Sequence, residues 1–186
     1  MGRVVVTEFV SLDGVIEAPG GDEDFEHAGW SLEIGRGDEG NKFKLDETMS
    51  ADALLLGRVT YEGFAKAWPP RDGEFADKFN SMPKYVVSST LNDPEWTNST
   101  VLKGDLTTEV ATLKERHDGD VVVHGSARLV QGLLELDLVD EVRLMVFPVV
   151  LGSGKRLFGA TSDKKRLRLV DSKVVGEGVA ILVYER

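Results

Sequence analysis

The stretch that decides the fold is residues 54–62, LLLGRVTYE, where an apolar run meets a helical pattern at Gly57. Residues 53–56 are short, aliphatic and uninterrupted, as in a strand that is buried on both faces. The residues that follow repeat at the i, i+3, i+4, i+7 spacing of an amphipathic helix: Tyr61, Phe64, Ala65 and Trp68. The stretch therefore predicts a buried strand that turns at Gly57-Arg58 into a helix, which ends before Pro69-Pro70.

The same alternation of strand and helix continues through the chain. Strands are predicted at 4–10, 84–89, 101–103, 120–124 and 142–147, and helices at 41–50, 72–80, 106–117 and 127–134, with Asp105 as an N-cap. In the helix at 41–50, Phe43, Leu45 and Met49 are the expected apolar contacts, and residues 11–40 are expected to form a long loop. Residues 167–175 and 179–184 flank Gly176-Glu177-Gly178 and predict an antiparallel hairpin. Residues 1–186 are thus predicted to form a single three-layer α/β/α domain with a mainly parallel sheet.

The composition excludes several classes of function. The chain of 186 residues has no cysteine and a formal net charge of −10. Disulfides and thiolate metal sites are therefore ruled out, and His27, His117 and His124 lack metal-ligand spacing, so no metal site is predicted. The charge opposes binding to nucleic acid or to anionic membranes, and the run Asp22-Glu23-Asp24 predicts a solvated segment. Neither a secretory signal nor a long apolar segment is found, which predicts a cytoplasmic protein.

Two turns are candidates for a phosphate site. At Gly57-Arg58 a glycine at a strand end lets a ligand approach the backbone, and the following helix offers free N–H groups. The alternative is a tight turn with a surface arginine. The sequence VVVHGSA, residues 121–127, repeats the pattern, although Ser126 could simply cap its helix. The two turns strengthen each other, because parallel strands end along one edge of a sheet.

Three further segments follow strands. Ser88 and Ser89 offer hydroxyls that could bind a ribose phosphate, although a simple turn is the more usual role. Asp13-Gly14 is a strong turn signal, and Asp13 could face a substrate. Residues 148–155, PVVLGSGK, lack the glycine and Ser/Thr positions of a P-loop, and the glycine that a dinucleotide fingerprint would need is absent at Leu157. They predict a loop that could line a ligand.

Several segments together resemble one superfamily. Residues 57–62, GRVTYE, resemble the G-R-x-T-[WY]-E segment of dihydrofolate reductases. Residues 11–16, SLDGVI, resemble the opening of the reductase domain of bifunctional riboflavin-biosynthesis deaminase-reductases. HGSA at 124–127 stands where the superfamily has its second glycine turn, and residues 138–142 and 148–158 resemble the riboflavin relatives. The resemblance implies a dihydrofolate-reductase-like fold, closest to the C-terminal reductase domain of the riboflavin proteins.

The resemblance also implies NADPH as cofactor. By matching position, Gly57, Arg58, Val59 and Thr60 would lie at the adenosine phosphates, Ser88 and Ser89 at the 2′-phosphate, and Gly125, Ser126, Ala127 and Arg128 at the pyrophosphate. Asp13 would lie near the nicotinamide or substrate. Dihydrofolate reductases hold the pterin with a carboxylate on their first long helix, and Glu39 and Asp46 are near that place. Asp13 and Glu39 are therefore the candidate catalytic residues. The second turn departs from the paired glycines of dihydrofolate reductases, because here it reads Gly125-Ser126.

The resulting prediction is an NADPH-dependent oxidoreductase that transfers hydride to a C=N or C=O carbon of a small heterocycle, pteridine-like or pyrimidine-like. One alternative is a non-catalytic dinucleotide-binding module, which would use the same turns. Another is an interaction domain without a ligand. The strand edges of the C-terminal hairpin are compatible with a homodimer.

Overall fold

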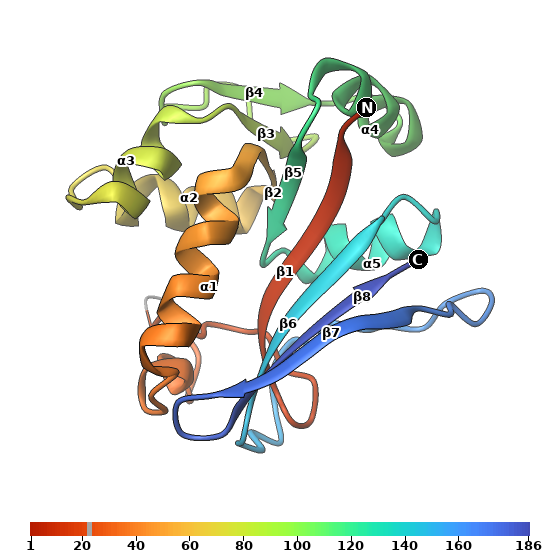
Figure 1. Ribbon diagram of the computed structural model, residues 1–186. Helices are drawn as coiled ribbons and strands as arrows, with labels where there is room; N and C mark the ends of the chain where they lie inside the picture. The colour runs from red at the N-terminus through yellow and green to blue at the C-terminus, as the bar shows by residue number, and fades with distance from the viewer. Residues whose placement is uncertain (22–23) are drawn as a thin grey trace.

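A sheet of eight strands forms the centre of the protein in the computed structural model, which describes residues 1–21 and 24–186 (Figure 1). The strand order is β4-β3-β2-β5-β1-β6-β8-β7. The described elements are β1 (Arg3–Ser11), the 3₁₀ turn η1 (Trp30–Leu32), α1 (Gly37–Ser50), β2 (Ala51–Gly57), α2 (Arg58–Ala67), α3 (Glu74–Ser81), β3 (Lys84–Val87), β4 (Ser99–Leu102), α4 (Leu106–Arg116), β5 (Asp120–His124), α5 (Ala127–Glu135), β6 (Glu141–Phe147), β7 (Arg168–Val175) and β8 (Val179–Glu185).

The sheet is parallel from β4 to β6 and antiparallel only in its C-terminal part. β8 pairs antiparallel with β6, and β7 pairs antiparallel with β8. The central strands are aliphatic along their length because both of their faces are covered, and residues 4–6, 54–56 and 121–123 are all buried. The predicted three-layer α/β fold with a C-terminal hairpin is therefore confirmed.

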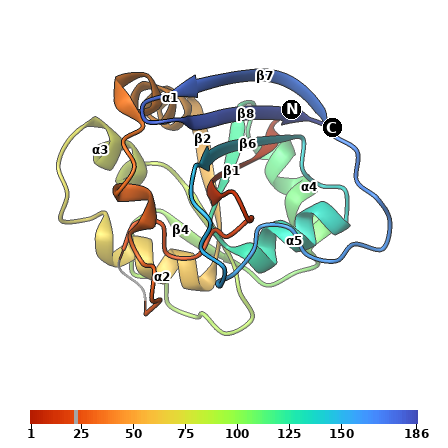
Figure 2. The same cartoon turned by 90° about the horizontal axis from the view of Figure 1, so that it is seen from below.

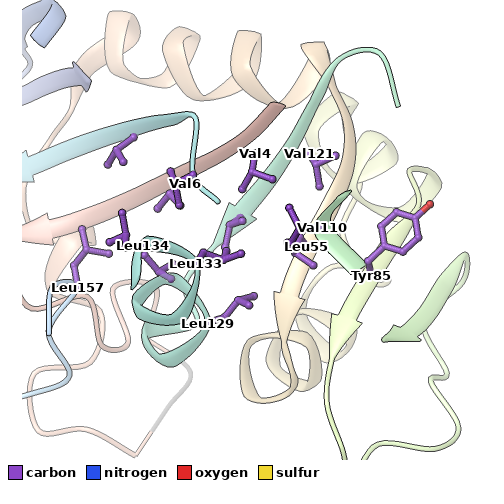
Figure 3. Close-up of a cluster of buried hydrophobic side chains, with 14 of the residues drawn as sticks. Val4, Val6, Leu55, Tyr85, Val110, Val121, Leu129, Leu133, Leu134 and Leu157 are labelled. Carbon is purple, nitrogen blue, oxygen red and sulfur yellow. The ribbon is translucent and has the colours of Figure 1, made fainter. Parts of the chain in front are cut away.

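The helices form one layer on each face of the sheet (Figure 2). α4 and α5 pack on the face that carries Val4, Val6 and Val121, where Leu129 and Leu133 of α5 complete the cluster (Figure 3). α2 and α3 pack on the opposite face, against alternate residues of the same strands. α1 lies on that second face and reaches β1 through polar contacts.

α1 differs from its prediction in both length and contacts. It begins at Gly37, and its buried residues are Gly40, Lys44, Glu47 and Thr48. The prediction that Met49 would be an apolar contact is wrong, since 47% of its surface is exposed. The apolar period of this helix was weak because the strand beneath it presents Thr7, so the buried side of the helix is polar.

β7 forms one edge of the sheet and is exposed along most of its length. Its apolar residues Leu169, Val170 and Val174 are accessible, with 72% of the Val174 surface exposed. The homodimer stays a prediction. Asp22 and Glu23 of the acidic run lie outside the described residues. Among the helices described, none has both the length and the apolar character that crossing a membrane requires.

Candidate functional site

The carboxyl ends of the parallel strands meet along one edge of the sheet. β2 ends at Gly57 and β5 ends at His124, and these two strands are neighbours. β5 lies between β2 and β1, although it follows both in the sequence. From β2 the chain goes on to β3, whereas from β5 it goes on to β6 in the opposite direction along the sheet. Ligands of open α/β sheets bind where the connections of neighbouring strands diverge in this way. The fold thus brings the two predicted phosphate turns side by side.

A hydroxyl joins the two turns. Ser126 Oγ accepts a hydrogen bond from the Gly57 backbone N–H at 2.8 Å and donates one to Thr60 Oγ1 at 2.8 Å. A Cβ at Gly57 would lie 3.0 Å from Ser126 Oγ, and a Cβ at Gly125, whose φ is +55°, would lie 3.0 Å from Thr60 Oγ1. Glycine is therefore needed at both places for the turns to approach this closely. We call this arrangement the turn clasp.

The clasp leaves two helix N-termini without side-chain caps. Ser126 adopts a left-handed conformation, with φ 64° and ψ 56°, and its side chain does not cap α5. Gly57 occupies the corresponding position before α2 and offers no capping side chain. The first N–H groups of a helix have no partner within the helix. Both helices therefore present donors and positive dipole ends at the same edge, an arrangement suited to phosphates.

The other residues predicted to bind the cofactor differ in their exposure and in their hydrogen-bond partners. Arg58 is half exposed, and its guanidinium donates to Glu62 Oε1 at 2.9 Å and to Glu62 Oε2 at 3.0 Å. Ser88 Oγ accepts from the Leu91 N–H at 3.0 Å, so it forms the turn that was the alternative interpretation. Of the remaining members of the predicted set, Ala127 is partly buried, and three are exposed: Val59, Ser89 and Arg128. Their roles in cofactor binding stay predictions.

Asp13 joins the end of β1 to the loop that follows β6. Its carboxylate accepts hydrogen bonds from the Leu151 N–H at 3.1 Å and the Gly152 N–H at 2.8 Å, and from Ser11 Oγ at 2.7 Å. These bonds, led by the one from Ser11, lower the pKa of Asp13 to about 2. The side chain is therefore ionised at neutral pH and positions a loop, which does not suit a proton donor. Its place near a substrate stays a prediction.

Glu39 is exposed in the first turn of α1, away from the polar contacts that the same helix makes with the sheet. Those contacts come from Lys44 and Glu47. Lys44 Nζ donates to Thr7 Oγ1 at 2.8 Å and to Glu47 Oε1 at 2.5 Å, and Thr7 Oγ1 also donates to Glu47 Oε1, at 2.9 Å. Sequence reasoning missed this buried triad. The signal was a Lys-Glu pair at i, i+3 in a helix with little apolar periodicity.

Glu47 stays ionised despite its burial. Burial opposes the charge, but Lys44 and Arg143 together hold the pKa of Glu47 below its ordinary value. Arg143 reaches Glu47 at 3.5 Å and forms an ion pair with Asp120 at 2.9 Å. The triad is thus the inner end of a charged network that lies between α1 and the sheet.

His124 stands next to Thr7 in the register of β1 and β5. Its ring packs 5.3 Å from the Phe79 ring and 6.2 Å from the Phe64 ring, measured between centroids. Burial, with the positive charge of Lys44 as a smaller cause, lowers the pKa of His124 to about 3. The imidazole is therefore neutral at physiological pH.

Comparison with known proteins identifies the family. Residues 3–181 match the model of the RibD C-terminal domain. The chain belongs to the RibD C-terminal domain family. The resemblance to the reductase domain of riboflavin-biosynthesis proteins is thereby confirmed. An uncharacterized relative, YyaP of Bacillus subtilis (strain 168), is 30% identical over 98% of this chain and 94% of its own length.

Solved structures share the fold at low sequence identity. A putative riboflavin biosynthesis protein from Shewanella sp. PV-4 matches with a TM-score of 0.80 and 23% identity, over 99% of this chain and 98% of the other. A pyrimidine reductase-like protein from Corynebacterium diphtheriae matches with a TM-score of 0.63 and 15% identity, over 98% of this chain and 91% of the other. Both confirm the architecture.

Proposed function

We propose that the protein is an NADPH-dependent reductase that delivers a hydride to a C=N or C=O carbon of a small pteridine-like or pyrimidine-like heterocycle. The observation that carries the proposal is the turn clasp of Gly57 and Ser126, which sets two uncapped helix N-termini at one sheet edge. Membership of the RibD C-terminal domain family supports the reaction class. The pyrimidine reductase-like fold neighbour supports the kind of substrate.

The residues of the clasp fit a dinucleotide. Gly57 and Gly125 let the two turns approach each other closely, so a pyrophosphate could contact both helix N-termini at once. The N-termini of α2 and α5 would supply N–H donors, while Arg58 would offer a planar fork to a 2′-phosphate. When bound, NADPH supplies the hydride.

The triad beneath α1 is the candidate for the substrate side. A lysine ammonium has three donors, and Lys44 uses two of them on Thr7 and Glu47. The third could bond a carbonyl oxygen or ring nitrogen of the substrate and deliver a proton to it. The neutral His124 and the aromatic rings beside it would help to exclude water. Lys44 would thus orient the substrate and hold the proton for it, because Asp13 is ionised and has no proton to give.

Titration with NADPH and NADH, followed by tryptophan fluorescence, tests the cofactor. Arg58→Ala should weaken NADPH far more than NADH, because only NADPH carries the 2′-phosphate. Glu62→Gln should tighten NADPH, since it releases the Arg58 guanidinium from its ion pair. A folded protein that shows no saturable change with either dinucleotide would overturn the proposal. Equal losses for the two dinucleotides in Arg58→Ala would remove Arg58 from the 2′-phosphate site.

Turnover distinguishes the reductase from a binding module. NADPH oxidation is followed at 25 °C in the presence of a panel of pteridines, flavins and pyrimidines. Oxidation that depends on one of these compounds supports the reductase. Tight NADPH binding without turnover of any compound in the panel would favour the non-catalytic module.

A further inference from the structure

A buried glutamate lies beside the second turn of the clasp. Glu8 follows Thr7 on β1, and Thr7 is the register partner of His124, so Glu8 is level with Gly125. Its place in the alternation of β1 puts its side chain on the face of Val6, which α5 covers. Only 5% of the residue is exposed, and its Oε1 atom has no hydrogen-bond partner among the described residues. A buried, unpaired carboxyl oxygen at a helix N-terminus is rare enough to call for a role.

The surroundings of Glu8 keep its carboxyl uncharged at neutral pH. Burial raises the pKa of Glu8 to about 8, while the Gly125 N–H and Lys44 oppose the rise and Glu47 adds to it. The other neighbouring elements bring little charge. His124 of β5 is neutral, the β6 register partner is Leu144, and the first turn of α5 holds no acidic residue and only an exposed Arg128.

We propose that Glu8 must be protonated for a dinucleotide to bind at the α5 turn, so that this one carboxyl sets the alkaline limit of cofactor affinity. The inference rests on the proposed function, because it assumes that a dinucleotide phosphate binds at this turn. An ionised Glu8 would oppose the ligand in two ways. It would hold the Gly125 N–H and the positive end of the α5 dipole more strongly, and from its buried position it would repel the phosphate.

Dinucleotide affinity measured against pH tests the inference. NADH is the better probe, because its pyrophosphate does not change charge in this range whereas the 2′-phosphate of NADPH titrates near pH 6. Its affinity should be flat from about pH 6.5 to 7 and fall at least about tenfold by about pH 9.5. Glu8→Gln keeps the shape of the neutral carboxyl, so it should match the unaltered protein near pH 7 and show no fall above it. Glu115→Gln, an exposed change of the same charge on α4, should keep the fall.

Calorimetry gives a second, independent measurement. Near pH 8, NADH binding measured in buffers of different ionisation enthalpy should take up about half a proton, because about half of the Glu8 carboxyls must first be protonated. Proton uptake that vanishes in Glu8→Gln supports the inference. NADH binding without proton uptake, or a fall in affinity that Glu8→Gln retains, overturns it. If neither dinucleotide binds at any pH, it is the proposed function that fails.

Discussion

Ser126 Oγ lies 2.8 Å from the Gly57 backbone nitrogen, although 69 positions separate the two residues in the sequence. This hydrogen bond joins the turn after β2 to the turn after β5. Because Ser126 also donates to Thr60, one hydroxyl bonds both to the first turn and to the helix that follows it. It holds both helix N-termini in one geometry while leaving their first N–H groups uncapped.

Removing this hydroxyl should affect both stability and binding. In Ser126→Ala the Gly57 N–H loses its acceptor in a partly buried place, which should lower the free energy of unfolding by about 1–3 kcal/mol. NADPH binding should weaken as well, since the two turns lose their common anchor. Urea denaturation and fluorescence titration measure the two effects. Thr112→Ala, which removes a hydroxyl on the exposed side of α4, is the control and should neither destabilise the protein nor weaken binding.

Gly125 and Gly63 allow a matched test of backbone conformation and of the room available for a side chain. Gly125→Ala forces an L-residue into a left-handed conformation, which costs about 1–2 kcal/mol, and places its Cβ 3.0 Å from Thr60 Oγ1. The variant should be destabilised and should bind NADPH poorly. Gly63 lies within α2, where an added Cβ would have no neighbouring atom within 4 Å, so Gly63→Ala should stabilise by about 0.5–1 kcal/mol. Equal stability of the two variants in thermal unfolding would contradict this account.

Asp13 should hold the loop that follows β6 in place rather than donate a proton to the substrate. Asp13→Asn removes one of the two oxygens that accept from Leu151 and Gly152, so hydrogen exchange at those amides should accelerate. The pKa of Asp13 is lowered from 3.8 to about 2, so its contribution is present above pH 3.8 and is lost as the pH falls through about 2. Exchange protection should therefore persist in the unaltered protein at about pH 5. Unchanged protection in the variant would show that the carboxylate does not hold the loop.

Breaking the buried pair of Lys44 and Glu47 should destabilise the protein strongly, whereas replacing both residues with apolar ones should destabilise it much less. Lys44→Met leaves the Glu47 charge without its closest partner and should destabilise by about 3–5 kcal/mol, whereas Lys44→Met with Glu47→Leu should recover much of the loss. Lys42 and Asp46 form an exposed i, i+4 pair on the same helix. Lys42→Met should therefore change stability by less than about 1 kcal/mol. A double variant no more stable than Lys44→Met would argue against a simple buried ion pair.

His124 should make the protein less stable in acid. Its pKa falls from 6.5 to about 3 on folding, so below pH 6.5 the unfolded chain binds the proton and the folded chain does not. The free energy of unfolding should therefore decrease as the pH falls from 6.5 towards 3, and His124→Gln should remove this part of the slope. Urea titrations at several pH values measure it.

Much of the architecture was predictable because hydrophobic periodicity is local. The strands at residues 4–10 and 120–124 and the apolar face of the helix after Gly57 follow directly from residue spacing. α1 was predicted less well, because its buried residues Lys44 and Glu47 pair with groups on the sheet rather than with an apolar surface. A buried polar face has no periodic signal of its own.

The amino-acid sequence by itself determined the order of the elements, the two glycine turns and the absence of cysteine chemistry. The tertiary structure decided which side chains meet. Ser126, a candidate helix cap, links the two turns instead. Asp13 accepts hydrogen bonds from the loop after β6, and Glu8 is buried beside Gly125. These outcomes depend on contacts between residues far apart in the chain and on the loss of solvent around charged groups. Local residue spacing carries neither kind of information.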